Sequence, residues 1–172
     1  MDDLRLHTPR LSLMPLSKEE LKWTLASPKT LEKNLGIRFD TSLIDENVIR
    51  AIGMKLPKMA KLPPEKHIWQ TYWLTILREE NIGIGLAGFK SSPNEAGISE
   101  IGYGIAPAYQ NQGYMSEALR ALVDWAFTQP DCLGVTATTV INPASNRILE
   151  KLGAALLSQD MQEKSWLIKK TS

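Results

Sequence analysis

The sequence predicts a mixed α/β fold, in which an antiparallel group of strands is followed by a strand–helix–strand unit. Between His67 and Ile105 the chain is rich in aromatic and β-branched residues and is interrupted by short polar turns. Residues 99–127 then have the pattern of a strand, a polar loop and an amphipathic helix, and the strand-like segment Leu133–Ile141 follows. Together these three observations predict a sheet with helices packed against it.

The N-terminal segment has the pattern of an interrupted strand followed by a helix. Apolar and polar residues alternate over much of Leu4–Leu16, which predicts the strand. Ser17 and Glu20 have the spacing of a capping box, in which each side chain bonds the other residue's backbone N–H, and this predicts a helix over Lys18–Ala26. We expect Pro28 to limit that helix.

Residues 31–66 have the weakest pattern in the chain. Apolar residues at helical spacing predict a helix over Asn47–Met59, and Pro57 is expected to end it. The Leu-Pro-Pro-Glu sequence at residues 62–65 then predicts a turn or a linker.

Three strands joined by short turns are expected in the middle of the chain. They are Ile68–Leu77, Ile82–Phe89 and Ile98–Ile105, separated by polar turns at residues 79–81 and 91–97. Because short connections join antiparallel neighbours, we expect these strands to form a meander.

A polar loop centred on Gln112 and Gly113 connects the third of these strands to a long helix that Pro130 ends. The apolar residues of the helix form one stripe: Met115, Ala118, Leu119, Leu122, Val123 and Ala126. The first N–H groups of a helix have no partner within it, and the helix dipole adds positive charge there, so a phosphate is the expected ligand. Gly113 has no Cβ, which would let that ligand approach the backbone.

Leu133–Ile141 is expected to form a further strand, followed by a helix and a last strand. Asn142 suits the N-cap of this helix, which runs through Leu152, and Gly153 suits the left-handed position after its end. Residues Ser165–Lys169 predict the last strand.

The segment Gln110–Met115 resembles the (Arg/Gln)-x-x-Gly-x-(Gly/Ala) signature of the GNAT superfamily of N-acetyltransferases, with Met115 as the departure. The flanking sequence resembles the branch that acetylates the N-termini of ribosomal proteins, and the Thr-Pro-Arg-Leu start of the first strand is also similar to the family. The resemblance implies the GNAT fold, with a mostly antiparallel sheet of about six or seven strands, in a single domain over residues 1–172. It further implies acetyl-coenzyme A as co-substrate and an amine as acceptor.

Residues Asn142–Gly153 are similar to a second GNAT segment, although Ala154 stands where an aromatic residue is usual. The helix also lacks the tyrosine with which many relatives reprotonate the leaving thiolate. Ordinary helix capping by Asn142 would explain the same residues without any ligand. Taken together, the two segments imply a coenzyme site formed by Tyr103, Ile105, Gln110, Asn111, Gln112, Gly113, Tyr114, Met115, Asn142, Ser145 and Asn146.

Glu100 and Ser145 are the candidate catalytic residues. An attacking amine must be neutral, and the tetrahedral intermediate needs a donor for its oxyanion. The resemblance implies Glu100 as the base, directly or through water; alternatively, Glu100 faces solvent or pairs with a basic residue on a neighbouring strand. A backbone N–H within Tyr103–Ile105 is the expected oxyanion donor, with a bulge permitted by Gly102 and Gly104. Ser145 or solvent would protonate the thiolate.

Composition favours a cytoplasmic protein without nucleic-acid, membrane or metal partners. The 172 residues include 20 basic and 19 acidic side chains, so no net charge attracts the chain to polyanions. No apolar run approaches the length of a membrane span. The lone Cys132 allows neither an internal disulfide nor a multi-cysteine metal site.

The acceptor and the oligomeric state stay open at this point. A protein or peptide N-terminal α-amine follows from the branch resemblance, whereas a small-molecule amine such as an aminoglycoside or a polyamine is the alternative within enzymes. A catalytically weak sensor or interaction domain that binds acyl-coenzyme A is the alternative from another class. The protein is expected to be a monomer or a homodimer.

Overall fold

A nine-stranded sheet frames the molecule in the computed structural model, which describes residues 3–172. Its strands are β1 (Leu6–His7), β2 (Leu11–Pro15), β3 (Arg38–Phe39), β4 (Trp73–Leu77), β5 (Ile82–Phe89), β6 (Ile98–Ile105), β7 (Gly134–Val140), β8 (Ala155–Gln159) and β9 (Lys164–Lys169). Their order is β1-β2-β4-β5-β6-β7-β9-β8, with β3 paired to β5, and only the β3–β5 and β6–β7 pairs among the described strands are parallel. The mixed α/β prediction is confirmed, but six or seven strands were too few.

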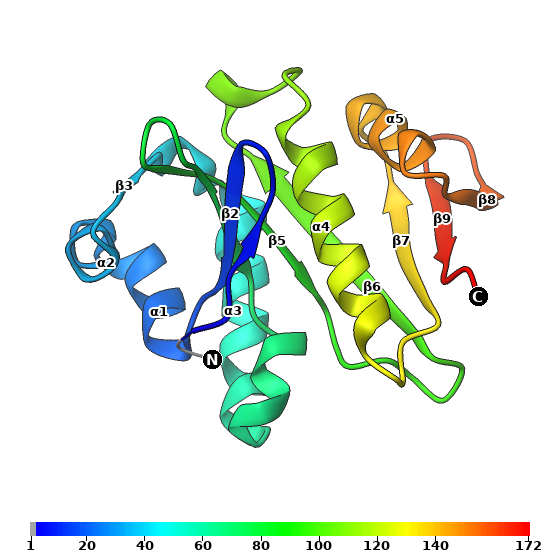
Figure 1. The fold of residues 1–172 in the computed structure, drawn as a ribbon, viewed down its shortest axis with the longest axis horizontal. Helices are drawn as coiled ribbons and strands as arrows, with labels where there is room; N and C mark the ends of the chain where they lie inside the picture. The colour runs from blue at the N-terminus through cyan, green and yellow to red at the C-terminus, as the bar shows by residue number, and fades with distance from the viewer. Residues whose placement is uncertain (1–2) are drawn as a thin grey trace.

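Helices cover both faces of this sheet. They are α1 (Lys18–Ala26), α2 (Pro28–Leu35), α3 (Glu46–Lys61), α4 (Tyr114–Thr128) and α5 (Pro143–Lys151). Figure 1 shows α4 crossing in front of β5 and β6, with α3 behind the sheet. The predicted βαβ crossover is therefore formed by β6, α4 and β7.

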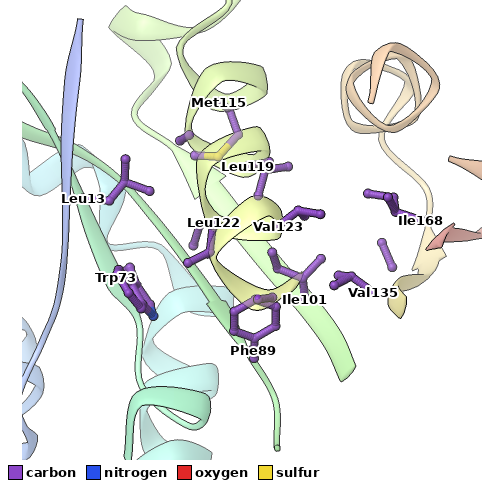
Figure 2. Packing of buried hydrophobic residues seen from close by; sticks show 14 of the residues in the cluster. Leu13, Trp73, Phe89, Ile101, Met115, Leu119, Leu122, Val123, Val135 and Ile168 are labelled. Carbon is purple, nitrogen blue, oxygen red and sulfur yellow. The ribbon is translucent and has the colours of Figure 1, made fainter. Parts of the chain in front are cut away.

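Two hydrophobic cores hold these layers together. The six stripe residues predicted for α4 are all buried in one cluster with Trp73, Phe89 and Ile101 of the sheet. Figure 2 shows four of them, Met115, Leu119, Leu122 and Val123. The second core lies under α1, α2 and α3, where Leu21, Leu31 and other side chains are buried. Burial of each large apolar side chain contributes about 1.5–3 kcal/mol, so the two cores anchor the sheet from both sides.

Several local predictions are confirmed at the level of single residues. Ser17 and Glu20 form both hydrogen bonds of the capping box, and α1 spans Lys18–Ala26 as predicted. The strands β5 and β6 have the predicted bounds. Asn142 caps α5 by accepting from the N–H of Ala144, and Gly153 after the helix has a φ of 78°.

Of the two proline predictions in the N-terminal half, that for Pro28 is confirmed and that for Pro57 was wrong. α1 ends before Pro28, which also opens α2 at a position where the missing N–H costs nothing. Pro57 lies inside α3, which continues to Lys61. Ile52 and Met59 on either side of it are fully buried, so tertiary packing outweighs the hydrogen bond that a helical proline loses.

Two strand predictions also need correction. Residues Pro64–Trp69 form 3₁₀ turns, so β4 starts at Trp73 and not at Ile68. The strand β8 was not predicted at all, because every one of its residues is exposed and its sequence lacks an apolar alternation. The expected bulge in β6 is absent from its pairing with β5, which is regular from Ile101 to Ile105.

Lys55 of α3 is a buried charged residue within an apolar pattern. Its Nζ lies 2.9 Å from the carbonyl oxygens of both Gln70 and Phe89, and 4.5 Å from the centre of the Tyr72 ring. Burial, with smaller contributions from Lys58 and Lys90, lowers the pKa of Lys55 to about 7. The lysine thereby ties α3 to the end of β5.

Candidate functional site

The strands β6 and β7 pair over only three residues and then diverge. Their parallel register runs from Ile98 to Glu100, whereas β6 stays paired with β5 as far as Ile105. Beyond Glu100 the two strands line opposite sides of a cleft of about 700 Å³, with Ile101–Ile105 on one side and Ala137–Ile141 on the other. The opening therefore comes from the divergence of two strands and needs no bulge.

The backbone of β6 offers free hydrogen-bonding groups to this cleft. The N–H of Lys90 donates to the carbonyl of Glu100, and the N–H of Ala106 donates to that of Ile84. Because an antiparallel pair alternates, the even-numbered residues of β6 bond to β5, and Ile101, Tyr103 and Ile105 face the other way. The N–H of Ile101 belongs to the last bridge between β6 and β7, at Glu100 and Thr136, whereas the N–H groups of Tyr103 and Ile105 lie beyond it and are directed toward the cleft.

The loop before α4 presents a second set of free donors. The N–H groups of residues 112–116 meet no protein acceptor within residues 3–172. Gly113 is the N-cap residue of α4 with a φ of 80°, and Asn111 is also left-handed with a φ of 59°. These two conformations turn the chain so that successive N–H groups converge at the positive end of the helix dipole, which is a suitable site for an anion.

Arg10, just before β2, holds this loop in place from a distant part of the sequence. Its Nη1 lies 2.9 Å from the carbonyl oxygen of Gln112, and its Nε lies 2.7 Å from Oε2 of Glu117. The guanidinium carbon also lies 4.3 Å above the centre of the Tyr114 ring. Its three contacts fix the loop against the first turn of α4 and add a positive charge beside the free N–H groups.

The N-terminal turn of α5 forms the other wall of the cleft, and Figure 1 shows it at the same end of the sheet as the loop before α4. The hydroxyl of Tyr103 lies 3.4 Å from the carbonyl oxygen of Ser145, across the cleft from β6. Burial raises the pKa of Tyr103 to about 12, so this phenol keeps its proton at neutral pH.

Asn146, also on α5, bonds to neighbouring strands instead. Its Oδ1 accepts a hydrogen bond from the indole N–H of Trp166, and its Nδ2 donates to the carbonyl oxygen of Val140.

Glu100 is held by two neighbours where β6 and β7 part. Its Oε1 accepts hydrogen bonds from the ammonium of Lys90, at the end of β5, and from the hydroxyl of Thr138 in β7, the latter at 2.7 Å. Burial acts to raise the pKa of Glu100, but the hydrogen bonds from Lys90 and Thr138 outweigh it and hold the pKa below its usual value. Of the two arrangements considered from sequence, the ion pair with a basic residue on a neighbouring strand is the one observed.

The cleft brings together most of the residues implied by the two sequence motifs. It is lined by Tyr103, Ile105, Gln110, Asn111, Gly113, Tyr114, Met115, Asn142 and Ser145. Gln112, Glu100 and Asn146 do not line it, although the two partners of Glu100, Lys90 and Thr138, do. No function was assigned to Arg10 or Lys90 from the sequence. For Arg10, the one sequence feature that could have indicated a role is its position just before an apolar strand.

Within residues 3–172, no group of three or more histidine, cysteine, aspartate or glutamate side chains is placed to hold a metal ion. Over the same residues, no helix has the length and apolar character needed to cross a membrane.

Residues 10–155 match the family model described as acetyltransferase (GNAT) domain. Two relatives from Bacillus subtilis, the uncharacterized N-acetyltransferases YjdG and YnaD, are 30% identical over 96 residues and 37% identical over 79 residues. These matches cover 55% and 45% of this chain, and 57% and 46% of the relatives. The chain thus spans about half the length of the curated relatives it matches.

Solved structures share the fold at low sequence identity. A GNAT-family acetyltransferase from Bacillus anthracis has a TM-score of 0.62 at 21% identity, with 96% of this chain and 98% of that chain covered. The ribosomal-protein-S5-alanine acetyltransferase from Vibrio fischeri has a TM-score of 0.64 at 16% identity, with 98% and 96% covered. RimL, a ribosomal L7/L12 α-N-protein acetyltransferase in complex with coenzyme A, has a TM-score of 0.64 at 16% identity, with 96% of this chain and 98% of that chain covered. With a family model matched over residues 10–155, this chain belongs to the GNAT acetyltransferase family.

Proposed function

We propose that this protein transfers the acetyl group of acetyl-coenzyme A directly to an amine, without a covalent enzyme intermediate, and that residues 1–172 form one such domain. The observation that carries the proposal is the row of free N–H groups at residues 112–116, at the start of α4, beside a cleft of about 700 Å³. Family membership supplies the co-substrate, because GNAT proteins use acetyl-coenzyme A. The proposal includes a cytoplasmic location, which suits a chain with a single cysteine.

The coenzyme would bind along the line of free backbone groups. The N–H groups of residues 112–116 would hold the pyrophosphate, with Gly113 allowing close approach and the side chains of Gln110, Asn111, Tyr114 and Met115 around it. The pantetheine arm carries two amides, which match the outward N–H and C=O groups along β6. Asn142 and Ser145 would contact the arm from the opposite wall of the cleft.

The chemical step would take place at the end of the cleft where β6 and β7 meet, close to Glu100. A neutral amine attacks the thioester carbon, and an N–H group of β6 that faces the cleft stabilises the resulting oxyanion. Glu100, directly or through a water molecule, accepts the proton that the amine loses. Ser145 or solvent returns a proton to the coenzyme thiolate. Lys90 and Thr138 both bond Oε1 of Glu100, so Oε2, which accepts from no residue between 3 and 172, would receive the proton from the amine.

We propose an N-terminal α-amine of a protein or peptide as the acceptor. A lysine amine with a pKa of about 10.4 costs roughly 4.6 kcal/mol to deprotonate at pH 7, whereas an α-amine near 7.8 costs about 1 kcal/mol. A weakly basic carboxylate such as Glu100 therefore suits the α-amine better. Of the described residues, the charged ones that line the cleft are one acid, Asp45, and three bases, Lys90, Arg147 and Lys151, which disfavours a polyamine.

A second function, a sensor domain that binds acyl-coenzyme A, is favoured by the same ion pair. Lys90 and Thr138 already occupy Oε1 of Glu100, and the helix α5 carries no tyrosine that could protonate the thiolate. A protein in which Lys90 never released Glu100 would bind the coenzyme and turn it over poorly.

One experiment separates these functions. Acetyl-coenzyme A is titrated into the protein by calorimetry, and release of free thiol is then measured with three acceptors: peptides with a free α-amine, the same peptides with a blocked α-amine and an internal lysine, and small polyamines. We expect binding, and thiol release that depends on the free α-amine. Binding with no release from any acceptor would support the sensor, and an absence of binding would overturn both functions.

A further inference from the structure

Lys90 is an amine placed inside the candidate active site. It follows the last residue of β5, lines the cleft, and donates a hydrogen bond to the carboxylate of Glu100. Its side chain is 54% exposed, so a ligand in the cleft can reach it. Lys22 makes a comparable ion pair with Glu19 at 49% exposure, but on the outer surface of α1 and not in the cleft.

The reactive end of the coenzyme would point toward this lysine. The anion site at residues 112–116 is at one end of β6 and Glu100 is near the other, separated from Ile105 by five residues, or about 17 Å of strand. An extended arm that leaves the anion site and follows the free groups of β6 therefore runs toward the point where β6 and β7 meet. Lys90, Glu100 and Thr138 lie together at that point.

We propose that Lys90 is a self-acetylation site, modified at Nζ by acetyl-coenzyme A bound in the same cleft; this step rests on the proposed function. The Lys90 ammonium first loses one proton to solvent. Its nitrogen then forms a bond to the acetyl carbonyl carbon, the C–S bond breaks, and the electron pair leaves with the coenzyme thiolate. The second proton released by the nitrogen passes to Glu100 and then to the thiolate, which gives Nζ-acetyl-Lys90 and free coenzyme A.

Placement in the cleft offsets the low reactivity of a lysine. With a pKa of about 10.4, roughly one lysine amine in 2,500 is neutral at pH 7. Reactants held in an oriented arrangement gain effective concentrations of about 10⁵ M or more, which exceeds that penalty. The reaction also needs to occur only once per molecule, since the product amide is stable.

Acetylation would change the state of Glu100. The amide product carries no charge, so Glu100 loses the cation that opposes the effect of burial and keeps the hydrogen bond from Thr138. Its pKa then rises and its carboxylate is free for an incoming amine. Self-acetylation of Lys90 would thereby prepare the site for external acceptors.

The test is to incubate the purified full chain with acetyl-coenzyme A, without any added acceptor, and to follow each lysine by peptide mass spectrometry. We expect one acetyl group at Lys90, introduced at least tenfold faster than at Lys22. The rate should rise with pH, because only a neutral amine attacks a thioester. Excess desulfo-coenzyme A, which fills the cleft without an acetyl group, should suppress it.

Matched controls exclude ordinary chemical reactivity. Lys90→Arg keeps the cation and cannot form the Nζ-amide, so the single acetyl group should vanish from the intact mass. Acetyl phosphate, which has no pantetheine arm, should modify Lys90 and Lys22 at similar rates. The unfolded protein should likewise show no preference for Lys90.

Equal labelling of Lys90 and Lys22 by acetyl-coenzyme A, or labelling that desulfo-coenzyme A does not suppress, would overturn the inference. Thiol release with external amines, measured in the same samples, keeps the two proposals apart. Turnover of external amines without Lys90 labelling rejects self-acetylation alone, and absence of both coenzyme binding and thiol release rejects the proposed function together with it.

Discussion

The two ends of the cleft differ in how completely their polar groups are satisfied. At the start of α4, the N–H groups of residues 112–116 have no acceptor in the described chain, and Arg10 adds a positive charge. At the opposite end, Oε1 of Glu100 accepts hydrogen bonds from both Lys90 and Thr138. The first end is therefore prepared for an anion, whereas at the second end the candidate base is already held by a cation and a hydroxyl.

This contrast indicates different energetic roles. Free N–H groups held by a rigid loop cost little to use, because they lose only water when a phosphate binds. The hydrogen bonds to Glu100 lower its pKa and make it a weaker base, which permits control of the reaction at that end. Binding of the coenzyme and transfer of the acetyl group should accordingly respond to different substitutions.

The largest effect on coenzyme binding is expected from Gly113→Glu, in the anion site before α4. Gly113 has a φ of 80°, and a Cβ there would lie 3.3 Å from Nη2 of Arg10, so the change adds backbone strain as well as a negative charge in the anion site. Calorimetry should show a loss of coenzyme affinity of at least about a hundredfold. Gly36→Glu is the matched control, because Gly36 has a φ of 66° with open space around it and lies outside the cleft. Equal affinity in both variants would remove the loop from the site.

Glu100→Gln should act on turnover and spare coenzyme binding. Removal of a general base costs about a hundredfold in kcat/KM near pH 7, and the loss should shrink above the pKa of the acceptor amine. Because hydrogen bonds outweigh burial and lower the pKa of Glu100, the carboxylate stays charged down to acid pH. The fall in wild-type kcat/KM toward acid pH should therefore follow protonation of the acceptor amine. Thr138→Val, which keeps the carboxylate, should cost only a few-fold. A pH profile of Glu100→Gln parallel to that of the wild type would contradict the base role.

The two ends of the cleft also differ in how much of their structure the sequence predicts. The loop before α4, the bounds of β5 and β6 and the capping of α5 depend on local sequence, and each was predicted. The partner of Glu100 depends on strand register across the turn between β5 and β6, so sequence left it as one of two alternatives. Pro57 within α3 and the exposed strand β8 depend on tertiary packing and pairing, which no local pattern reveals.

Arg10→Lys should weaken coenzyme binding by about tenfold. A lysine cannot bond Glu117 and the Gln112 carbonyl at once while stacking on Tyr114, so the loop would lose its support. Titration of both proteins with coenzyme A measures the change. Arg5→Lys, at an exposed position outside the cleft, is the control and should leave affinity unaltered.

Ser145→Ala is expected to have the smallest effect, a decrease in kcat of about threefold. The substitution removes one hydroxyl donor from the cleft and leaves the carbonyl that Tyr103 contacts. Rapid-mixing measurements of thiol release would detect the change, with Ser116→Ala on α4 compared in parallel. An unaltered single-turnover rate would leave thiolate protonation to solvent.

The central claim, that the free N–H groups before α4 bind the coenzyme, can be tested most directly by ¹H–¹⁵N nuclear magnetic resonance during a titration with coenzyme A. The amide signals of residues 112–116 should shift strongly as they gain a phosphate acceptor, and those of Tyr103 and Ile105 should shift with them. Signals of residues 112–116 that stay in place while the protein binds coenzyme A would contradict this claim.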